Sequence, residues 1–257
     1  MRRSEINKFI LLNTHRSGTR LLLGSLECYL PIKCYRNAFE LTIILERFAV
    51  SRLKSPFYRF QSTSLKRRID YFFHQKKLIN DFLTELYTPV NGARVIGVRV
   101  LYEQADKYPE ILDWARENDI AIIHLIRENS LKAVVHTEAS FKRGLLHSTS
   151  RTEPLTKLRL SPARLEMQLI RLMQHIEKYR IALEGARYLE VNYEALVAQR
   201  QVESHRILDF LKIDRDETID PEEKKVGLLP DSLQDMLENY EEIRQAFRGT
   251  VFERFLS

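Results

Sequence analysis

The 257-residue sequence contains few of the residues that build disulfide-rich scaffolds or flexible linkers. Its two cysteines, Cys28 and Cys34, cannot form a disulfide framework, and their spacing does not match a zinc-binding motif. Eight glycines and eight prolines are too few for long disordered linkers. We therefore expect a cytoplasmic protein that folds as a single domain over residues 1–257.

The sequence also lacks a long apolar run. No stretch approaches the roughly 20 apolar residues of a membrane helix, so we expect no transmembrane segment. Lys8 and Asn13 interrupt the N-terminal apolar stretch, whereas a signal peptide needs an uninterrupted apolar core. This stretch is therefore predicted to form the first strand of the fold.

The charge balance is mildly basic, with a net charge of +6 at pH 7. Such an excess suits a small anionic substrate. Without a clustered basic patch it does not predict a nucleic-acid partner. The sequence does not decide the oligomeric state, so a homo-oligomer remains open.

Alternating strand and helix patterns predict an α/β fold. Four apolar runs predict strands buried on both faces of a parallel sheet, at Lys8–Asn13, Ala93–Val100, Ile120–Ile126 and Arg187–Val191. Helical patterns lie between them, at Thr19–Leu30, Leu41–Leu53, Leu65–Tyr87, Asp106–Asn118, Ser130–Lys142 and from Ser161 to about Leu183. This alternation is typical of a doubly wound parallel sheet flanked by helices.

Two segments interrupt the regular alternation. Helical patterns at Leu41–Leu53 and Leu65–Tyr87 form an insertion around residues 41–90, and Lys142–Leu160 has the composition of an exposed loop. Loops of that length are uncommon unless they are functional or mobile. We expect these two segments to determine which substrate the protein accepts.

A short polar turn follows the first predicted strand and leads directly into a leucine-rich helix. It reads His15-Arg16-Ser17-Gly18-Thr19-Arg20. The first N–H groups of a helix have no partner within the helix, so this layout can hold a phosphate. The Walker pattern of kinases and NTPases, G-x-x-x-x-G-K-[ST], does not occur in the sequence.

The order basic residue, Ser, Gly, Thr directly after a buried strand resembles the 5′-phosphosulfate loop of sulfotransferases that use PAPS (3′-phosphoadenosine 5′-phosphosulfate). An ordinary strand–turn–helix connection would have the same local pattern. The resemblance implies a P-loop-like sulfotransferase fold, in which the six residues His15 to Arg20 bind the co-substrate. It also implies PAPS as sulfuryl donor, PAP (adenosine 3′,5′-bisphosphate) as product, and no metal.

A second basic residue, Arg127, follows the strand Ile120–Ile126 and precedes a helix. This segment is similar to the 3′-phosphate-binding element of sulfotransferases, so the resemblance implies that Arg127 binds this phosphate. Bacterial carbohydrate-type members have a Ser nine residues after the Arg, where this sequence has His136. His136 can donate to a phosphate, and Ser130 and Ser140 are alternatives for completing the site.

Other stretches resemble the same family, of the bacterial trehalose- or nodulation-factor-like carbohydrate type. They are Gly97–Gln104 with its basic residue Arg99, the segment Leu189–Leu196 followed by Ile207–Leu211, and the C-terminal stretches Leu237–Glu242 and Gly249-Thr250. The family members carry a catalytic Glu shortly after the first helix, and Glu40 occupies the matching place. A Glu at the start of a helix can instead interact with the helix dipole.

The resemblance implies transfer of the sulfuryl group from PAPS to a carbohydrate or glycolipid hydroxyl. Arg16 would stabilise the charge on the departing phosphate, and Glu40 would accept the hydroxyl proton. His136 and His15 are rival bases, His124 is expected in the core, and His74, His147, His175 and His205 are expected at the surface. Two other functions stay open: a nucleotide kinase or NTPase with a divergent phosphate loop, and a non-catalytic PAP-binding protein.

Overall fold

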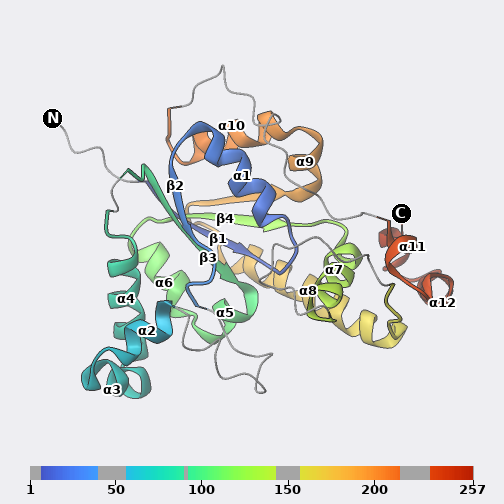
Figure 1. Cartoon of the computed structure of the whole chain (residues 1–257), viewed down its shortest axis with the longest axis horizontal. Coiled ribbons are helices and arrows are strands. Elements are labelled where there is room, and N and C mark those ends of the chain that lie inside the picture. Colours follow the sequence, from blue (N-terminus) through green and yellow to red (C-terminus); the bar gives the residue numbers. More distant parts are fainter. Residues whose placement is uncertain (1–6, 40–55, 90–91, 143–156, 215–231, 257) are drawn as a thin grey trace.

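The computed structural model describes residues 7–39, 56–89, 92–142, 157–214 and 232–256. A five-stranded parallel sheet lies at its centre, with helices on both faces (Figure 1). The strands are β1 (Asn7–Asn13), β2 (Ile32–Tyr35), β3 (Val95–Leu101), β4 (Ala121–Ile126) and β5 (Tyr188–Asn192). Their spatial order is β2-β3-β1-β4-β5, so β1 pairs with β3 on one side and β4 on the other. The predicted α/β doubly wound fold is confirmed.

The sheet has a hydrophobic core on each face because its central strands are apolar on both sides. Along β1, Phe9 and Leu11 pack into one core, and Ile10 and Leu12 pack into the other. All four side chains are fully buried. Successive side chains of a strand point to opposite faces, so a run without polar residues must be covered twice.

The described helices are α1 (Thr19–Tyr29), α2 (Pro56–Ser62), α3 (Leu65–Phe73), α4 (Gln75–Leu86), α5 (Tyr102–Lys107), α6 (Glu110–Glu117), α7 (Ser130–Lys142), α8 (Pro162–Ala182), α9 (Tyr193–Ala198), α10 (Arg200–Phe210), α11 (Leu233–Met236) and α12 (Tyr240–Phe247), with a 3₁₀ turn η3 (Glu253–Phe255). α1, α9 and α10 contribute to the core that contains Phe9, and α4 to α8 contribute to the other. No helix in these ranges is long and apolar enough to cross a membrane.

Some predicted elements differ from the structure. β2 was not predicted, because it has only four residues and lies at the sheet edge, where its side chains are only partly buried. Leu65–Tyr87 is two helices, α3 and α4, separated at His74. The predicted helix Asp106–Asn118 is wrong at its start, because α5 ends at Lys107 and Pro109 precedes α6. A proline has no N–H to continue the hydrogen-bonding ladder of the preceding helix.

The predicted helix Leu41–Leu53 lies outside the described residues, as does most of the loop Lys142–Leu160.

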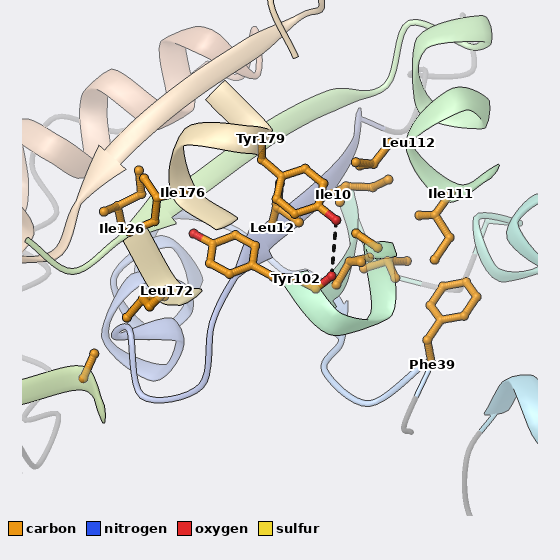
Figure 2. Close-up of a cluster of buried hydrophobic side chains, with 14 of the residues drawn as sticks. Ile10, Leu12, Phe39, Tyr102, Ile111, Leu112, Ile126, Leu172, Ile176 and Tyr179 are labelled. Atoms are coloured by element: carbon orange, nitrogen blue, oxygen red, sulfur yellow. Dashed lines mark hydrogen bonds between the residues drawn. The ribbon is translucent and has the colours of Figure 1, made fainter. Parts of the chain in front are cut away.

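The core on the α8 side contains a group of aromatic side chains beside the end of β3. Figure 2 shows Tyr102 of α5 and Tyr179 of α8 among the aliphatic side chains of this cluster. Their rings are stacked with centroids 5.5 Å apart, and the Tyr179 hydroxyl oxygen lies 3.3 Å from the Tyr102 carbonyl oxygen. This contact fixes α8 against the start of α5, which matters for the pocket described below.

Candidate functional site

The polar turn after β1 lies at the carboxyl edge of the sheet and leads into α1. Gly18 is the N-cap of α1 and has a left-handed backbone, with φ of 103°. Its carbonyl accepts the first helical hydrogen bond, from the Leu22 N–H at 3.1 Å. As a glycine, Gly18 has no side chain with which to cap the helix. The first N–H groups of α1 are therefore oriented as in helix N-termini that bind anions.

Gly18 contacts the ring of Tyr193, the first residue of α9. A Cβ atom at position 18 would lie 2.2 Å from Cδ2 of Tyr193, far inside van der Waals contact. Only glycine satisfies both the positive φ and this close approach. The contact joins residues 175 positions apart in the sequence and attaches the loop to β5 and α9.

We predict that Gly18→Ala destabilises the protein by more than backbone strain alone. A non-glycine residue at positive φ costs about 1–2 kcal/mol, and overpacking against Tyr193 adds roughly 1–3 kcal/mol. Gly185 is a matched control because its φ is 76° and a Cβ atom there would have no described atom within 4 Å. Urea unfolding of both variants measures the difference. Equal losses for Gly18→Ala and Gly185→Ala would contradict the steric role of Tyr193.

A chain of hydrogen bonds orients the hydroxyl of Thr19. Nε of Arg99, near the end of β3, donates to Oδ1 of the fully buried Asn13 at 3.1 Å. Nδ2 of Asn13 in turn donates to Oγ1 of Thr19 at 2.5 Å. Because the Thr19 oxygen accepts this bond, its own proton is left to donate elsewhere. The Ser17 hydroxyl is used differently, since it is buried and donates to the Thr14 carbonyl at 3.0 Å.

Positive charge gathers at this edge of the sheet. Burial, with a smaller contribution from the positive charges of Arg36 and Arg16, lowers the pKa of Arg99 to about 10. Arg16 itself has a left-handed backbone, with φ of 58°. These positively charged guanidinium groups repel one another, and an anion bound among them would offset that repulsion. Arg20, in the first turn of α1, is exposed.

Arg127 follows β4 at the same sheet edge and lies next to the loop. It is 5% exposed, and its guanidinium carbon lies 4.7 Å from the centroid of the Tyr193 ring, the ring that contacts Gly18. Its buried Nε atom donates no hydrogen bond within the described residues, although the side chain makes other contacts. A carboxylate partner would be the alternative role for Arg127, but one candidate, Asp119, precedes β4 and therefore lies at the opposite edge of the sheet, roughly 20 Å away.

The turn after Arg127 is held by Glu194, the second residue of α9. Its two carboxylate oxygens accept the backbone N–H groups of Glu128 at 3.0 Å and Asn129 at 3.2 Å. Asn129 in turn caps α7 by accepting the Lys132 N–H at 2.9 Å. α9 therefore positions both the turn carrying Arg127 and, through Tyr193, the loop before α1.

The three candidates for completing the second phosphate site all lie on α7. His136 is 3% exposed, and its Nε2 atom has no hydrogen-bond partner in the described part of the chain, while the side chain makes other contacts. The Ser140 hydroxyl donates to the His136 carbonyl at 2.7 Å, which occupies its one proton. Ser130 is buried at the start of the helix. Because the Ser140 proton is already donated, His136 remains the preferred prediction over Ser140.

A pocket of about 180 Å³ opens beside the loop. It is lined by Thr14 and His15 of the loop, Glu103 of α5, Ala133, Val134, Thr137 and Phe141 of α7, and Gln168, Arg171, Leu172 and His175 of α8. The Thr137 hydroxyl lies 3.5 Å from the His15 carbonyl, and the rings of His15 and Phe141 form an edge contact at 6.1 Å. The pocket therefore combines a largely apolar wall from α7 with carboxylate, amide, guanidinium and imidazole groups.

His175, which the sequence predicts at the surface, lines this pocket and is 15% exposed at its side chain. Its Nε2 atom lies 2.8 Å from Oδ2 of Asp106, whose other oxygen accepts bonds from Lys178 at 2.5 Å and Tyr179 at 2.6 Å. Burial works to raise the pKa of Asp106, but these hydrogen bonds outweigh it and hold the pKa below its usual range. An ionised Asp106 fixes the orientation of the His175 ring, a pairing that no local pattern in the sequence indicates.

Two further predicted residues, His124 and Glu40, have different outcomes. His124 is fully buried in β4 and hydrogen-bonded to the hydroxyls of Tyr102 and Tyr188, both at 2.7 Å, so its assignment to the core is confirmed. Burial lowers the pKa of His124 to about 4, which keeps it neutral. Glu40, the predicted base, lies outside the described residues.

Comparison with known proteins finds matches in structure only. No family model matches the chain, and no curated protein sequence matches it. A sulfotransferase from Alicyclobacillus acidocaldarius superposes with a TM-score of 0.52 at 16% identity, covering 98% of this chain and 96% of that one. Mouse sulfotransferase SULT7A1 complexed with PAP gives a TM-score of 0.47 at 14% identity, covering 97% and 87%. The likeness to the Alicyclobacillus structure shows that this chain has the sulfotransferase fold.

Proposed function

We propose that the protein transfers the sulfuryl group of PAPS to a hydroxyl of a carbohydrate or glycolipid. The observation that carries this proposal is the contact of Gly18 and Arg127 with one ring, that of Tyr193. Two anion-binding elements, the loop before α1 and the Arg127 turn, are thereby held at a fixed separation. A nucleotide with phosphate groups at both its 5′ and 3′ positions matches this arrangement, whereas ATP has no 3′-phosphate.

The roles of the residues follow from the charges that change during transfer. As the acceptor oxygen bonds to sulfur, the bond between sulfur and the phosphate oxygen breaks and leaves negative charge on PAP. Arg16 and the N–H groups at the start of α1 stabilise that charge. His15, Ser17, Gly18, Thr19 and Arg20 belong to the same binding loop. Arg127 and His136 hold the 3′-phosphate, and Glu40 takes the hydroxyl proton.

The pocket beside the loop is the place we propose for the acceptor. Its volume of about 180 Å³ suits a single small ring, and its lining offers an apolar wall together with hydrogen-bonding groups of both kinds. Such a mixture suits a sugar, whose ring has apolar C–H faces and a rim of hydroxyls. His175, oriented by Asp106, would hold one of these hydroxyls.

Binding experiments test the nucleotide assignment directly. We expect calorimetry to show that the protein binds PAP more tightly than adenosine 5′-phosphate, and that ATP with Mg²⁺ does not compete. Preferential binding of ATP with Mg²⁺ would favour the kinase alternative. Transfer of sulfate from PAPS to a panel of sugars then separates an enzyme from a non-catalytic PAP-binding protein.

Arg127→Ala should weaken PAP binding by about tenfold to 100-fold and leave the affinity for adenosine 5′-phosphate nearly unchanged. A charge-assisted bidentate contact contributes roughly 1.5–3 kcal/mol, and only PAP carries the phosphate that makes it. Arg244→Ala on α12 is the control for the loss of one positive charge, since Arg244 pairs with Glu241 on the same exposed helix. Equal losses for the two nucleotides would mean that Arg127 does not bind the 3′-phosphate.

A further inference from the structure

α3 has its apolar side chains on the outside of the protein. Leu65, Ile69, Phe72 and Phe73 lie at spacings of four, three and one, which places them on one side of the helix. Their exposed fractions are 72%, 47%, 77% and 77%. Figure 1 shows α3 at the periphery of the molecule, beyond α2 and α4. Large apolar side chains gathered on one exposed helix face mark an interaction surface.

The opposite side of α3 faces the protein and carries charged residues together with Tyr71, which packs against the core. Asp70 is the one residue of this helix that is buried, at 7% exposure. Its carboxylate lies 3.2 Å from Nδ1 of His74 and 3.3 Å from Nζ of Lys77. Arg67 stacks on the Phe60 ring at 3.7 Å and pairs with Glu85 at 3.4 Å. Most of the large apolar side chains of α3 therefore point outward, whereas those of an ordinary surface helix face the core.

Basic residues flank the exposed apolar face. The segment from Ser64 to Lys77 contains five lysines and arginines and one carboxylate. Lys66 and Arg68 are exposed and form no ion pair with a carboxylate of the described residues. Lys76, the next exposed cation, pairs with Glu117 at 2.9 Å. An apolar face flanked by cations such as Lys66 and Arg68 is complementary to a surface in which anionic groups lie over an apolar layer.

We propose that α3 binds the surface of a membrane that contains anionic phospholipids. Leu65, Ile69, Phe72 and Phe73 would enter the boundary between headgroups and acyl chains, and Lys66 and Arg68 would contact the anionic headgroups. The helix lies in the plane of the interface and does not cross the bilayer. This inference is independent of the proposed transfer activity, although a protein held at a membrane would meet lipid-linked acceptors readily.

Co-sedimentation of the full chain with vesicles tests the proposal. We expect binding to vesicles of phosphatidylcholine mixed with phosphatidylglycerol, and much weaker binding to phosphatidylcholine alone. Phe72→Ser with Phe73→Ser should lower the partition coefficient at least about tenfold, because two large apolar groups are removed from the interface. Met167→Ser with Ile181→Ser is the matched control, since these α8 side chains are 65% and 66% exposed. Lys66→Gln with Arg68→Gln should reduce binding only to the anionic vesicles.

Three results would overturn the proposal. The first is equal vesicle binding by the Phe72/Phe73 variant and its control. The second is concentration-dependent dimerisation of the parent in sedimentation velocity that the Phe72/Phe73 variant abolishes, because the face would then join two copies of the chain. The third is a large fall in melting temperature for that variant, which would mean that the face is covered by the protein's own chain.

Discussion

Arg16→Ala should reduce kcat for sulfate transfer by ~10²–10³ while leaving the fold intact. Arg16 lies in the loop before α1, and its charge acts on the guanidinium of Arg99 at the end of β3. It is therefore placed where we propose that the phosphate oxygen gains negative charge as the phosphosulfate bond breaks. Removing a group that stabilises such developing charge affects the transition state more than the bound substrate.

The backbone conformation at position 16 should not change the stability of this variant relative to the parent. Arg16 has a φ of 58°, and alanine carries the same Cβ atom, so the strain is shared by parent and variant. Unfolding by urea should therefore give nearly equal stabilities. Arg244→Ala is the control for the loss of one positive charge, because Arg244 lies on α12 and pairs with Glu241. A fall in kcat of less than about tenfold for Arg16→Ala would refute the assignment of the loop.

Glu40→Gln should remove sulfate transfer, by ~10²–10⁴ in rate, and keep PAP affinity at the parent value. The change preserves the shape of the side chain and removes only its capacity to accept a proton. The preceding residue, Phe39, is 1% exposed, and its ring packs 5.2 Å from those of Phe57 and Phe82. Arg36, four residues before Glu40, is close enough to Arg99 for its positive charge to lower the pKa of that guanidinium.

The pH dependence gives a second test of the base. A carboxylate accepts a proton only when it is ionised, so kcat should fall as the pH drops below the pKa of the base in the bound enzyme. Glu103→Gln tests the rival carboxylate, since Glu103 lines the pocket proposed for the acceptor. Near-normal kcat in Glu40→Gln would refute the assignment, and His15 and His136 would then be tested. A loss confined to Glu103→Gln would move the role to that residue.

The sequence was sufficient for the elements whose patterns are local. The apolar run Lys8–Asn13, the polar turn and the leucine-rich helix predict the strand, loop and helix that the structure contains. Contacts between distant segments leave no such pattern. Asp106 and His175 are 69 positions apart, and their pairing depends on how α8 packs against α5. Spacing alone likewise could not tell that α3 turns Asp70 inward and Phe72 outward.

The Tyr193 contact also bears on when the site forms during folding. One half of the proposed nucleotide site comes from residues near position 18, yet it rests against a ring near position 193, beyond the last strand of the sheet. A truncated chain that ends before β5 contains the loop but lacks the Tyr193 ring that the loop packs against. Nucleotide binding should therefore report the completed native state. Added nucleotide should stabilise the full chain against unfolding, and should not stabilise a truncated chain that lacks β5 and α9.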